Sequence, residues 1–258
     1  MSGLSIGLAT IATGRYVELL PGLLESAREH FFPDASLSLY VFTDAPAVEP
    51  GATALAVEHE PWPLVTLNRY RYFREYAALF RGLDYLFFVD VDMRFVARCF
   101  DAILPDETER LVAVEHPGFW RGHRGFASRA LDACTGGRWS ARPLPHAKLP
   151  FERDPRSTAC ITDTAHRYYY AGGFNGGRTG AFLDMARTLR DAIDTDLENG
   201  VMAVWHDESH LNRYLHAHPP KRLTPAYCYP ESHWPHLRHL TPVIVALDKD
   251  HAYFRQAG

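Results

Sequence analysis

Short apolar runs alternate with amphipathic stretches over about the first 115 residues of the chain. Runs rich in β-branched and aromatic residues predict strands at residues 4–10, 36–43, 53–57, 85–89 and 111–114. Apolar residues at helical spacing predict helices at 16–31 and 64–80. Pro21 interrupts the first of these, so that helix either kinks or begins late. The alternation indicates an α/β fold with a largely parallel sheet.

The second half of the chain is less regular. Residues 118–164 are rich in Gly, Pro, Arg and Ser without a period, which predicts loops with short helical pieces. Apolar positions predict helices at 182–197 and 208–216 and a last strand at 243–247. Because no repeat, linker or shift in composition marks a boundary, we expect residues 1–258 to form a single domain.

Composition narrows the choice of partners and compartment. The net charge of −4 argues against non-specific binding to nucleic acid or to an anionic membrane. The four cysteines are far apart and form no C-x-x-C pair, so we expect reduced thiols. The N-terminus has no basic region followed by a long apolar segment, so we expect no signal peptide, no transmembrane segment and a cytoplasmic location.

Two carboxylates stand at the end of a predicted buried strand. The run YLFFV at residues 85–89 leads directly into Asp90-Val91-Asp92. Alternate residues of an extended chain point the same way, so Asp90 and Asp92 can converge on one hard cation such as Mn²⁺ or Mg²⁺. A metal with two protein ligands keeps positions open for phosphate oxygens. The competing interpretation is a strand that ends at a solvated turn.

A second unusual segment, YAGGFNGG at residues 170–177, holds four glycines within six residues. Such a density removes side chains where a ligand approaches the backbone. A sharp turn between two strands is the alternative. The chain contains neither a Walker sequence nor a G-x-G-x-x-G at a strand-to-helix turn, so neither a P-loop nor a dinucleotide site is predicted.

The third segment is WHDESH at residues 205–210. Asp207 and Glu208 open a predicted helix, where the helix dipole favours negative charge, and this alone would account for them. His206 and His210 stand four residues apart, so a zinc site is an alternative. The zinc-protease pattern H-E-x-x-H needs Glu at the position that Asp207 occupies.

Further residues are candidates individually. Arg69, Lys249 and Arg255 are possible anion contacts or plain surface charges. Tyr16 and Trp62 are able to stack on a ring, although packing in the core is the commoner use of such residues.

Together these segments resemble glycosyltransferase family 6, which includes the histo-blood-group A and B transferases, the α-1,3-galactosyltransferase and bacterial relatives. In chain order, the matching stretches are YVFTD, DYLFFVDVDM, HPGF, FERDP, YYYAGGFNGG, ENGVMAVWHDESHLNRYL and DKDH. The resemblance implies the GT-A nucleotide-sugar transferase fold, a Rossmann-like mixed sheet flanked by helices. It also implies transfer, with retention, of N-acetylgalactosamine or galactose from its UDP donor to the 3-hydroxyl of a galactoside, including fucosylated ones.

The resemblance also assigns roles. Asp90 and Asp92 match the D-x-D that binds Mn²⁺, with Mg²⁺ a second option, and the UDP diphosphate. Glu208 matches the carboxylate described as nucleophile or as stabiliser of oxocarbenium charge. The remaining donor-binding positions are Tyr16, Trp62, Arg69, Ala171, Gly172, Gly173, Asp207, Lys249 and Arg255. The acceptor-binding positions are His116, Trp205 and Glu231, the last standing with Pro230 where mammalian members place an aspartate.

Several features bear on activity and specificity. The chain keeps D-x-D where many bacterial relatives carry N-x-N, and Pro150 stands where the family has an acceptor-contacting threonine. Gly173 is the residue that the family associates with the N-acetylated donor. The competing classes of function are a sugar-binding module without catalysis, which Asp90, Asp92 and Glu208 together argue against, and a zinc hydrolase using His206 and His210.

Overall fold

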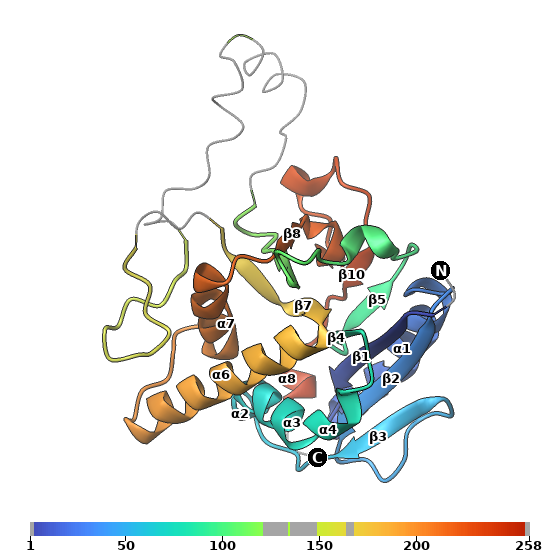
Figure 1. The fold of residues 1–258 in the computed structure, drawn as a ribbon, viewed down its shortest axis with the longest axis horizontal. Helices are drawn as coiled ribbons and strands as arrows, with labels where there is room; N and C mark the ends of the chain where they lie inside the picture. The colour runs from blue at the N-terminus through green and yellow to red at the C-terminus, as the bar shows by residue number, and fades with distance from the viewer. Residues whose placement is uncertain (1–2, 121–133, 135–148, 164–167, 256–258) are drawn as a thin grey trace.

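A seven-stranded sheet with the order β3-β2-β1-β4-β7-β6-β8 forms the centre of the molecule (Figure 1). We analysed a computed structural model, which describes residues 3–120, 134, 149–163 and 168–255. The strands of this sheet are β1 (Ser5–Ile11), β2 (Ser36–Thr43), β3 (Ala52–Ala56), β4 (Tyr85–Val89), β6 (Leu111–Glu115), β7 (Tyr170–Arg178) and β8 (Lys221–Leu223).

The sheet is parallel in one half and mixed in the other. Strands β3, β2, β1 and β4 run parallel to one another, as the alternation of strands and helices predicts. Strand β7 is antiparallel to both of its neighbours, β4 and β6, and β8 is parallel to β6. The prediction of a largely parallel sheet therefore holds only for the first half. The mixed sheet implied by the family resemblance is confirmed.

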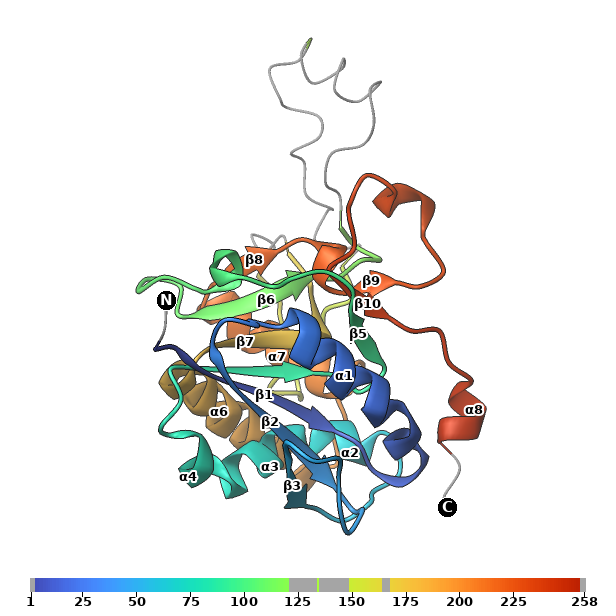
Figure 2. The ribbon, with the colours of Figure 1, turned by 90° about the vertical axis from the view of Figure 1, so that its right-hand side faces the viewer.

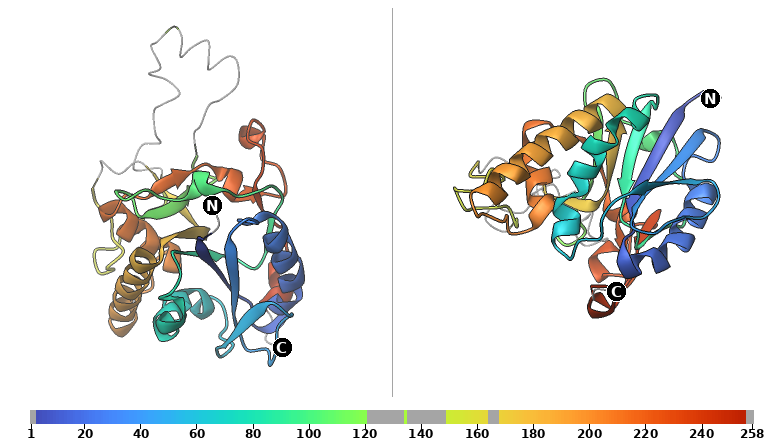
Figure 3. Two further views of the ribbon diagram at one scale, coloured as in Figure 1. Left: turned by 45° about the vertical axis from the view of Figure 1, so that its right-hand side comes forward. Right: turned by 90° about the horizontal axis from the view of Figure 1, so that it is seen from below.

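Helices cover both faces of the sheet (Figures 2 and 3). Helix α1 (Leu20–His30) lies on one face, and α3 (Arg69–Glu75), α6 (Thr179–Glu198) and α7 (His206–Ala217) lie on the other. Strand β4 contributes to both cores because its side chains alternate: Phe87 and Val89 pack on the α1 face, and Leu86 and Phe88 on the α6 face. Every residue of β4 is buried, which explains its unbroken apolar run.

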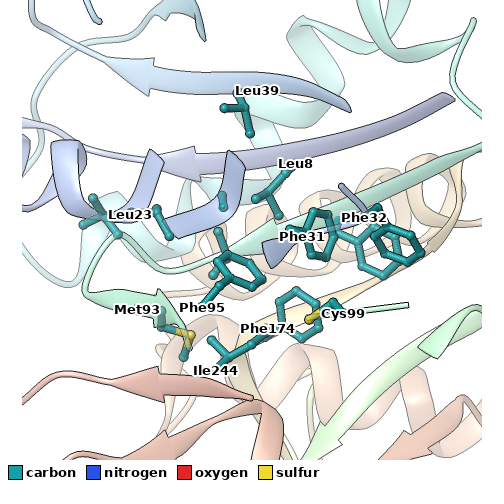
Figure 4. Close-up of a cluster of buried hydrophobic side chains, with 14 of the residues drawn as sticks. Leu8, Leu23, Phe31, Phe32, Leu39, Met93, Phe95, Cys99, Phe174 and Ile244 are labelled. Atoms are coloured by element: carbon teal, nitrogen blue, oxygen red, sulfur yellow. The ribbon is translucent and has the colours of Figure 1, made fainter. Parts of the chain in front are cut away.

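Aromatic packing fixes β4 against β7 on the α1 face. Phe87 and Phe174 stack with ring centroids 5.8 Å apart and planes 8° from parallel. Phe31 meets the edge of Phe87 at 5.3 Å, and Phe95 lies 5.0 Å from Phe31. Figure 4 shows Phe31, Phe95 and Phe174 among the buried residues of this cluster. This core holds the ends of β4 and β7 in place.

Several helix boundaries differ from the predictions. Helix α1 begins at Leu20, after a 3-10 helix at Gly14–Leu19, so Pro21 stands in its first turn and the late start is correct. The predicted helix at 64–80 is three short helices, α2 (Leu64–Leu67), α3 and α4 (Ala77–Phe80), because the backbone leaves regular helical geometry at Asn68 and Tyr76. The helices predicted at 182–197 and 208–216 are α6 and α7.

A second sheet of three strands, with the order β5-β10-β9, carries the C-terminal segment. Its strands are β5 (Met93–Phe95), β9 (Tyr229–Pro230) and β10 (Ile244–Ala246), and the chain after β10 runs to α8 (His251–Phe254) at the edge of the molecule (Figure 2). Strands β5, β8 and β9 were not predicted.

The predicted loop at 118–164 falls partly outside the described residues. Its described parts, 118–120 and 149–163, form turns and irregular segments. All four cysteines are free thiols. Among the helices that the structure describes, none combines the length and the apolar character needed to cross a membrane.

Candidate active site

Two adjoining cavities open where β4 ends beside β7. The first has a volume of about 220 Å³, and the second about 300 Å³. Trp62, Thr66, Arg69 and Asp90 line both, so the two cavities form one continuous site. Of the predicted residues, the first cavity adds Tyr16, Asp92, Lys249 and Arg255, and the second adds Gly172, Gly173, Trp205, Asp207 and Glu208.

Asp90 and Asp92 face the first cavity together. The backbone N–H of Asp90 donates to the carbonyl of Gly173 at 2.8 Å, which fixes the end of β4 against β7. Desolvation raises the pKa of the Asp90 carboxyl, Arg69 opposes that rise, and the neighbouring Asp92 carboxylate adds to it. Two carboxylates that repel each other in one cavity are a donor set that fits a hard divalent cation.

Arg69 lines both cavities and pairs with a carboxylate in each of them. Its guanidinium is buried and contacts both the Asp90 carboxylate at 3.1 Å and the Asp207 carboxylate at 3.3 Å. It also donates to the carbonyl of Gly172 at 2.8 Å and lies 3.9 Å from the centre of the Phe88 ring. A planar guanidinium with several donors suits this arrangement, in which one cation orders two carboxylates and a strand.

Glu208 lies in the second cavity on the first turn of α7. Its Oε2 accepts a hydrogen bond from the backbone N–H of Gly172 at 2.7 Å. Burial raises its pKa to about 7, although the hydrogen bond from Gly172 works in the opposite direction. The carboxyl group is thus held rigidly and titrates near neutrality, which is typical of a group that takes part in chemistry.

The glycine-rich segment is the interior of β7, so the interpretation as a turn is wrong. A Cβ on residue 172 would lie 3.5 Å from Oε2 of Glu208 and 3.6 Å from Nη1 of Arg69. A Cβ on residue 173 would meet Cε of Met93 and lie 3.1 Å from Oδ2 of Asp90. Gly172 thus leaves ordinary van der Waals room beside Glu208, whereas Gly173 allows the Met93 side chain to pack against the backbone of β7. Ala171 is instead buried in the core on the α1 face, and it lines neither cavity as the described residues define them.

Residues 247–255, called the C-terminal segment below, form the outer wall of the first cavity through Lys249, Phe254 and Arg255. Lys249 pairs with the Asp92 carboxylate, and its ammonium lies 5.5 Å from the centre of the Tyr16 ring. The Phe254 ring lies 5.2 Å from that of Tyr16, and the guanidinium of Arg255 lies 4.0 Å from the Trp62 ring. The structure therefore brings Tyr16, Trp62, Lys249 and Arg255 together around one cavity.

Of the three residues predicted to contact the acceptor, only one lines a cavity as the described residues define it. Trp205 lines the second cavity and is half exposed. His116 and Glu231 do not line either cavity as the described residues define them. The His116 ring packs 5.8 Å from Tyr169, and burial lowers its pKa to about 4. Glu231 is exposed and accepts a hydrogen bond from the backbone N–H of Asp248 at 2.8 Å.

The sequence profile of glycosyltransferase family 6 matches residues 1–129 and 139–256 of the chain. The chain belongs to glycosyltransferase family 6. Its mixed sheet flanked by helices is the GT-A-like fold that the resemblance implies.

Curated relatives agree with this family. The rat histo-blood group ABO system transferase 1 is 32% identical over 97% of this chain and 68% of its own length. The human globoside alpha-1,3-N-acetylgalactosaminyltransferase 1 is 30% identical over 88% of this chain and 61% of its own, and the human alpha-1,3-galactosyltransferase 2 is 31% identical over 88% and 63%. The chain thus spans about three fifths to two thirds of the length of these relatives.

His206 and His210, the two histidines considered as zinc ligands, contact an aromatic ring and a carboxylate respectively. The His206 ring lies 4.9 Å from Trp62, edge to face. His210 is buried, and its Nε2 lies 3.6 Å from the Asp196 carboxylate. Within the described ranges, no group of three or more His, Cys, Asp or Glu side chains is arranged to hold a metal ion.

Two residues that the sequence analysis did not single out hold the backbone around the family 6 site in place. The Asn212 side chain exchanges hydrogen bonds with the backbone of Tyr170 at 2.8 and 2.9 Å, which ties α7 to β7. Glu152 accepts from the backbone N–H of Val204 at 2.6 Å and so fixes the segment before Trp205. The position of Asn212, four residues after Glu208, was a usable signal. Glu152 lies in the FERDP stretch that matches the family, but no local pattern indicated its contact with Val204.

Proposed function

We propose that the chain is a retaining glycosyltransferase that moves N-acetylgalactosamine or galactose from a UDP donor to the 3-hydroxyl of a galactoside. The observation that carries the proposal is the placement of Glu208, whose pKa is raised to about 7, in a cavity that adjoins the Asp90 and Asp92 carboxylates. Family membership and the names of the relatives, two of which specify N-acetylgalactosaminyl or galactosyl transfer, support the same class of reaction.

In this proposal the first cavity holds UDP. Tyr16 and Trp62 offer aromatic faces to the nucleoside, and Lys249 and Arg255 offer positive charge to the diphosphate. Asp90 and Asp92 would hold Mn²⁺ or Mg²⁺. When bound, the cation would neutralise charge on the leaving diphosphate.

The donor sugar then occupies the second cavity, above Gly172 and Gly173. Arg69 keeps Asp207 ordered beside the sugar through their ion pair at 3.3 Å. Glu208 lies at the anomeric carbon. Its ionised form either bonds to that carbon as the bond to the UDP oxygen breaks, or stabilises positive charge on the sugar ring without bonding. In both cases the acceptor hydroxyl bonds to the anomeric carbon from the face that UDP leaves, which retains the configuration. Its proton passes to an oxygen of the departing diphosphate, and any bond between Glu208 and the sugar breaks in the same step.

The acceptor side is assigned to Trp205, His116 and Glu231. Trp205 is half exposed at the rim of the second cavity, where its ring offers an apolar face to a galactoside. Gly173 favours the N-acetylated donor, because a methyl group at this position would overlap Cε of Met93 and lie 3.1 Å from Oδ2 of Asp90, and so would displace side chains at the donor cavity.

Release of UDP from UDP-N-acetylgalactosamine and UDP-galactose, measured with and without Mn²⁺ over a panel of galactosides, tests this proposal. We expect metal-dependent release that a galactoside accelerates. UDP or sugar binding without any turnover would identify a sugar-binding module instead, and hydrolysis that depends on Zn²⁺ would identify a hydrolase.

A further inference from the structure

Glu231 hydrogen-bonds the backbone at residues 246 and 248, where the C-terminal segment leaves β10. Its backbone N–H donates to the carbonyl of Ala246 at 2.9 Å, which continues the pairing of β9 with β10. Its carboxylate then reaches one step further and accepts from the backbone N–H of Asp248 at 2.8 Å. Glu231 therefore binds two backbone groups, at residues 246 and 248, just before Lys249.

The other side of the same segment is bound to the D-x-D. The backbone N–H of Leu247 donates to the carbonyl of Asp92 at 2.9 Å. Residues 246–248 thus run between Asp92 on one side and Glu231 on the other. Because Lys249 follows directly and pairs with the Asp92 carboxylate, the direction of its side chain depends on how this short stretch is held.

Beyond Lys249 the segment is attached mainly through exposed contacts. Arg15 donates to the carbonyl of Tyr253 at 3.2 Å, and the Phe254 ring lies 5.2 Å from the Tyr16 ring. The Tyr253 hydroxyl donates to Glu18 at 3.0 Å. The hydrogen bond from Asp248 to Glu231 is exposed as well, and each exposed contact contributes little stability individually. The Glu231 bond differs from the others because it holds the residue directly before Lys249.

We propose that Glu231 is a positioning residue for the donor site: it anchors residues 246–249 so that Lys249 is held at the diphosphate position. This inference rests on the proposed function. It adds a donor-side role to a residue that the family resemblance assigns to the acceptor, and it links the two sides of the reaction. The carboxylate oxygen acts as a hydrogen-bond acceptor, so the length of the side chain matters more than its charge.

The test compares Glu231→Ala, which removes the acceptor oxygen, with Glu231→Gln, which keeps one at the same reach. Ser232→Ala, at the exposed next residue, is the matched control. Hydrogen exchange of the backbone amides at 247–255 is measured first in the free protein. We expect faster exchange at Asp248 in Glu231→Ala, and exchange near that of the parent in Glu231→Gln and Ser232→Ala. Unchanged exchange in Glu231→Ala would overturn the anchor.

UDP affinity is then measured by calorimetry with Mn²⁺ and without any acceptor, so that an acceptor-contact role cannot affect it. We expect Glu231→Ala to weaken UDP binding by about three- to tenfold, the range for one lost hydrogen bond, and Glu231→Gln to restore it. In a Lys249→Ala background the effect of Glu231→Ala should disappear, because the anchor acts through Lys249.

Normal UDP affinity in Glu231→Ala, with only the KM for the acceptor raised, would overturn the donor-side role. If the parent chain does not bind UDP at all, the proposed function is wrong. The exchange measurement still decides in that case whether Glu231 anchors the segment.

Discussion

The centre of the site and its outer wall are held in different ways. At the centre, the buried Arg69 guanidinium contacts Asp90, Asp207 and the carbonyl of Gly172, and Glu208 accepts from the backbone of the same glycine. At the wall, Arg255 lies over a half-exposed Trp62, and α8 is attached through exposed side chains. The buried centre is therefore preorganised, whereas the wall is able to adjust to a ligand.

The largest expected effect concerns the pair of carboxylates at the end of β4. Removing the charge of one of the two converging carboxylates should strongly weaken cation binding, because Asp90 alone would then face the diphosphate position from the end of β4. We expect Asp92→Asn, or EDTA, to reduce transfer by at least about a hundredfold. Asp34→Asn, which alters a carboxylate paired with Arg98 and absent from both cavities, is the control. Full activity in EDTA would exclude the metal role.

The two arginines test the comparison between centre and wall directly. Arg69→Met leaves the buried Asp207 without its partner, so we expect a loss of about 3–5 kcal/mol in the free energy of unfolding. Arg255→Met removes only an exposed contact and should cost less than about 1 kcal/mol. Urea denaturation of both variants measures the difference. Equal losses would show that the centre is no more rigidly built than the wall.

The preference between the two donor sugars tests the shape of the cavity at the centre of the site. In Gly173→Ala the new methyl group would overlap Cε of Met93 and lie 3.1 Å from Oδ2 of Asp90, so the Met93 side chain must move, and we expect the space above β7 to narrow. We expect a shift in preference toward UDP-galactose of about 10–200-fold, the usual effect of one methyl group. Competition between the two donors measures it, and Met93→Leu controls for movement of that side chain. A parent chain that prefers UDP-galactose would contradict the pocket argument.

The pH dependence tests whether Glu208 acts as a carboxylate. Burial raises its pKa to about 7, so below that pH the folded chain holds it protonated. We expect kcat/KM to fall about tenfold per pH unit below 7. The same shift favours the folded state at low pH, so its contribution to stability should be lost as pH rises from the ordinary value of a Glu side chain through 7. A flat profile between pH 5 and 8 would contradict this role.

The amino-acid sequence predicts the parts of the site that lie within one element. The strand ending at Val89, the D-x-D after it and the helix bearing Glu208 follow from local patterns. Strands β5, β8 and β9 have three residues or fewer and lie in no longer apolar run, whereas β10, also three residues long, lies within the apolar run at 243–247. The burial of Ala171 follows from the alternation of side chains along β7, but only once that segment is known to be a strand.

Contacts between distant elements could not be predicted in this way. Arg69 and Gly172 are 103 residues apart, and Lys249 and Asp92 are 157 apart. Arg69 meets Gly172 because α3 begins beside β7, and Lys249 meets Asp92 because the segment after β10 runs past the end of β4; no local pattern records either arrangement. The family resemblance named these residues as site members, but their ion pairs and hydrogen bonds come from the fold.

Glu208→Gln provides the most direct test of the central claim that this carboxylate lies at the reacting carbon. The amide keeps an oxygen that can accept from Gly172, so the fold and the first cavity should be preserved. The measurement pairs the turnover of UDP-N-acetylgalactosamine with the affinity for UDP in the same preparation. We predict that turnover falls by at least about a thousandfold while UDP affinity changes less than about threefold. Turnover near that of the parent chain would contradict the account.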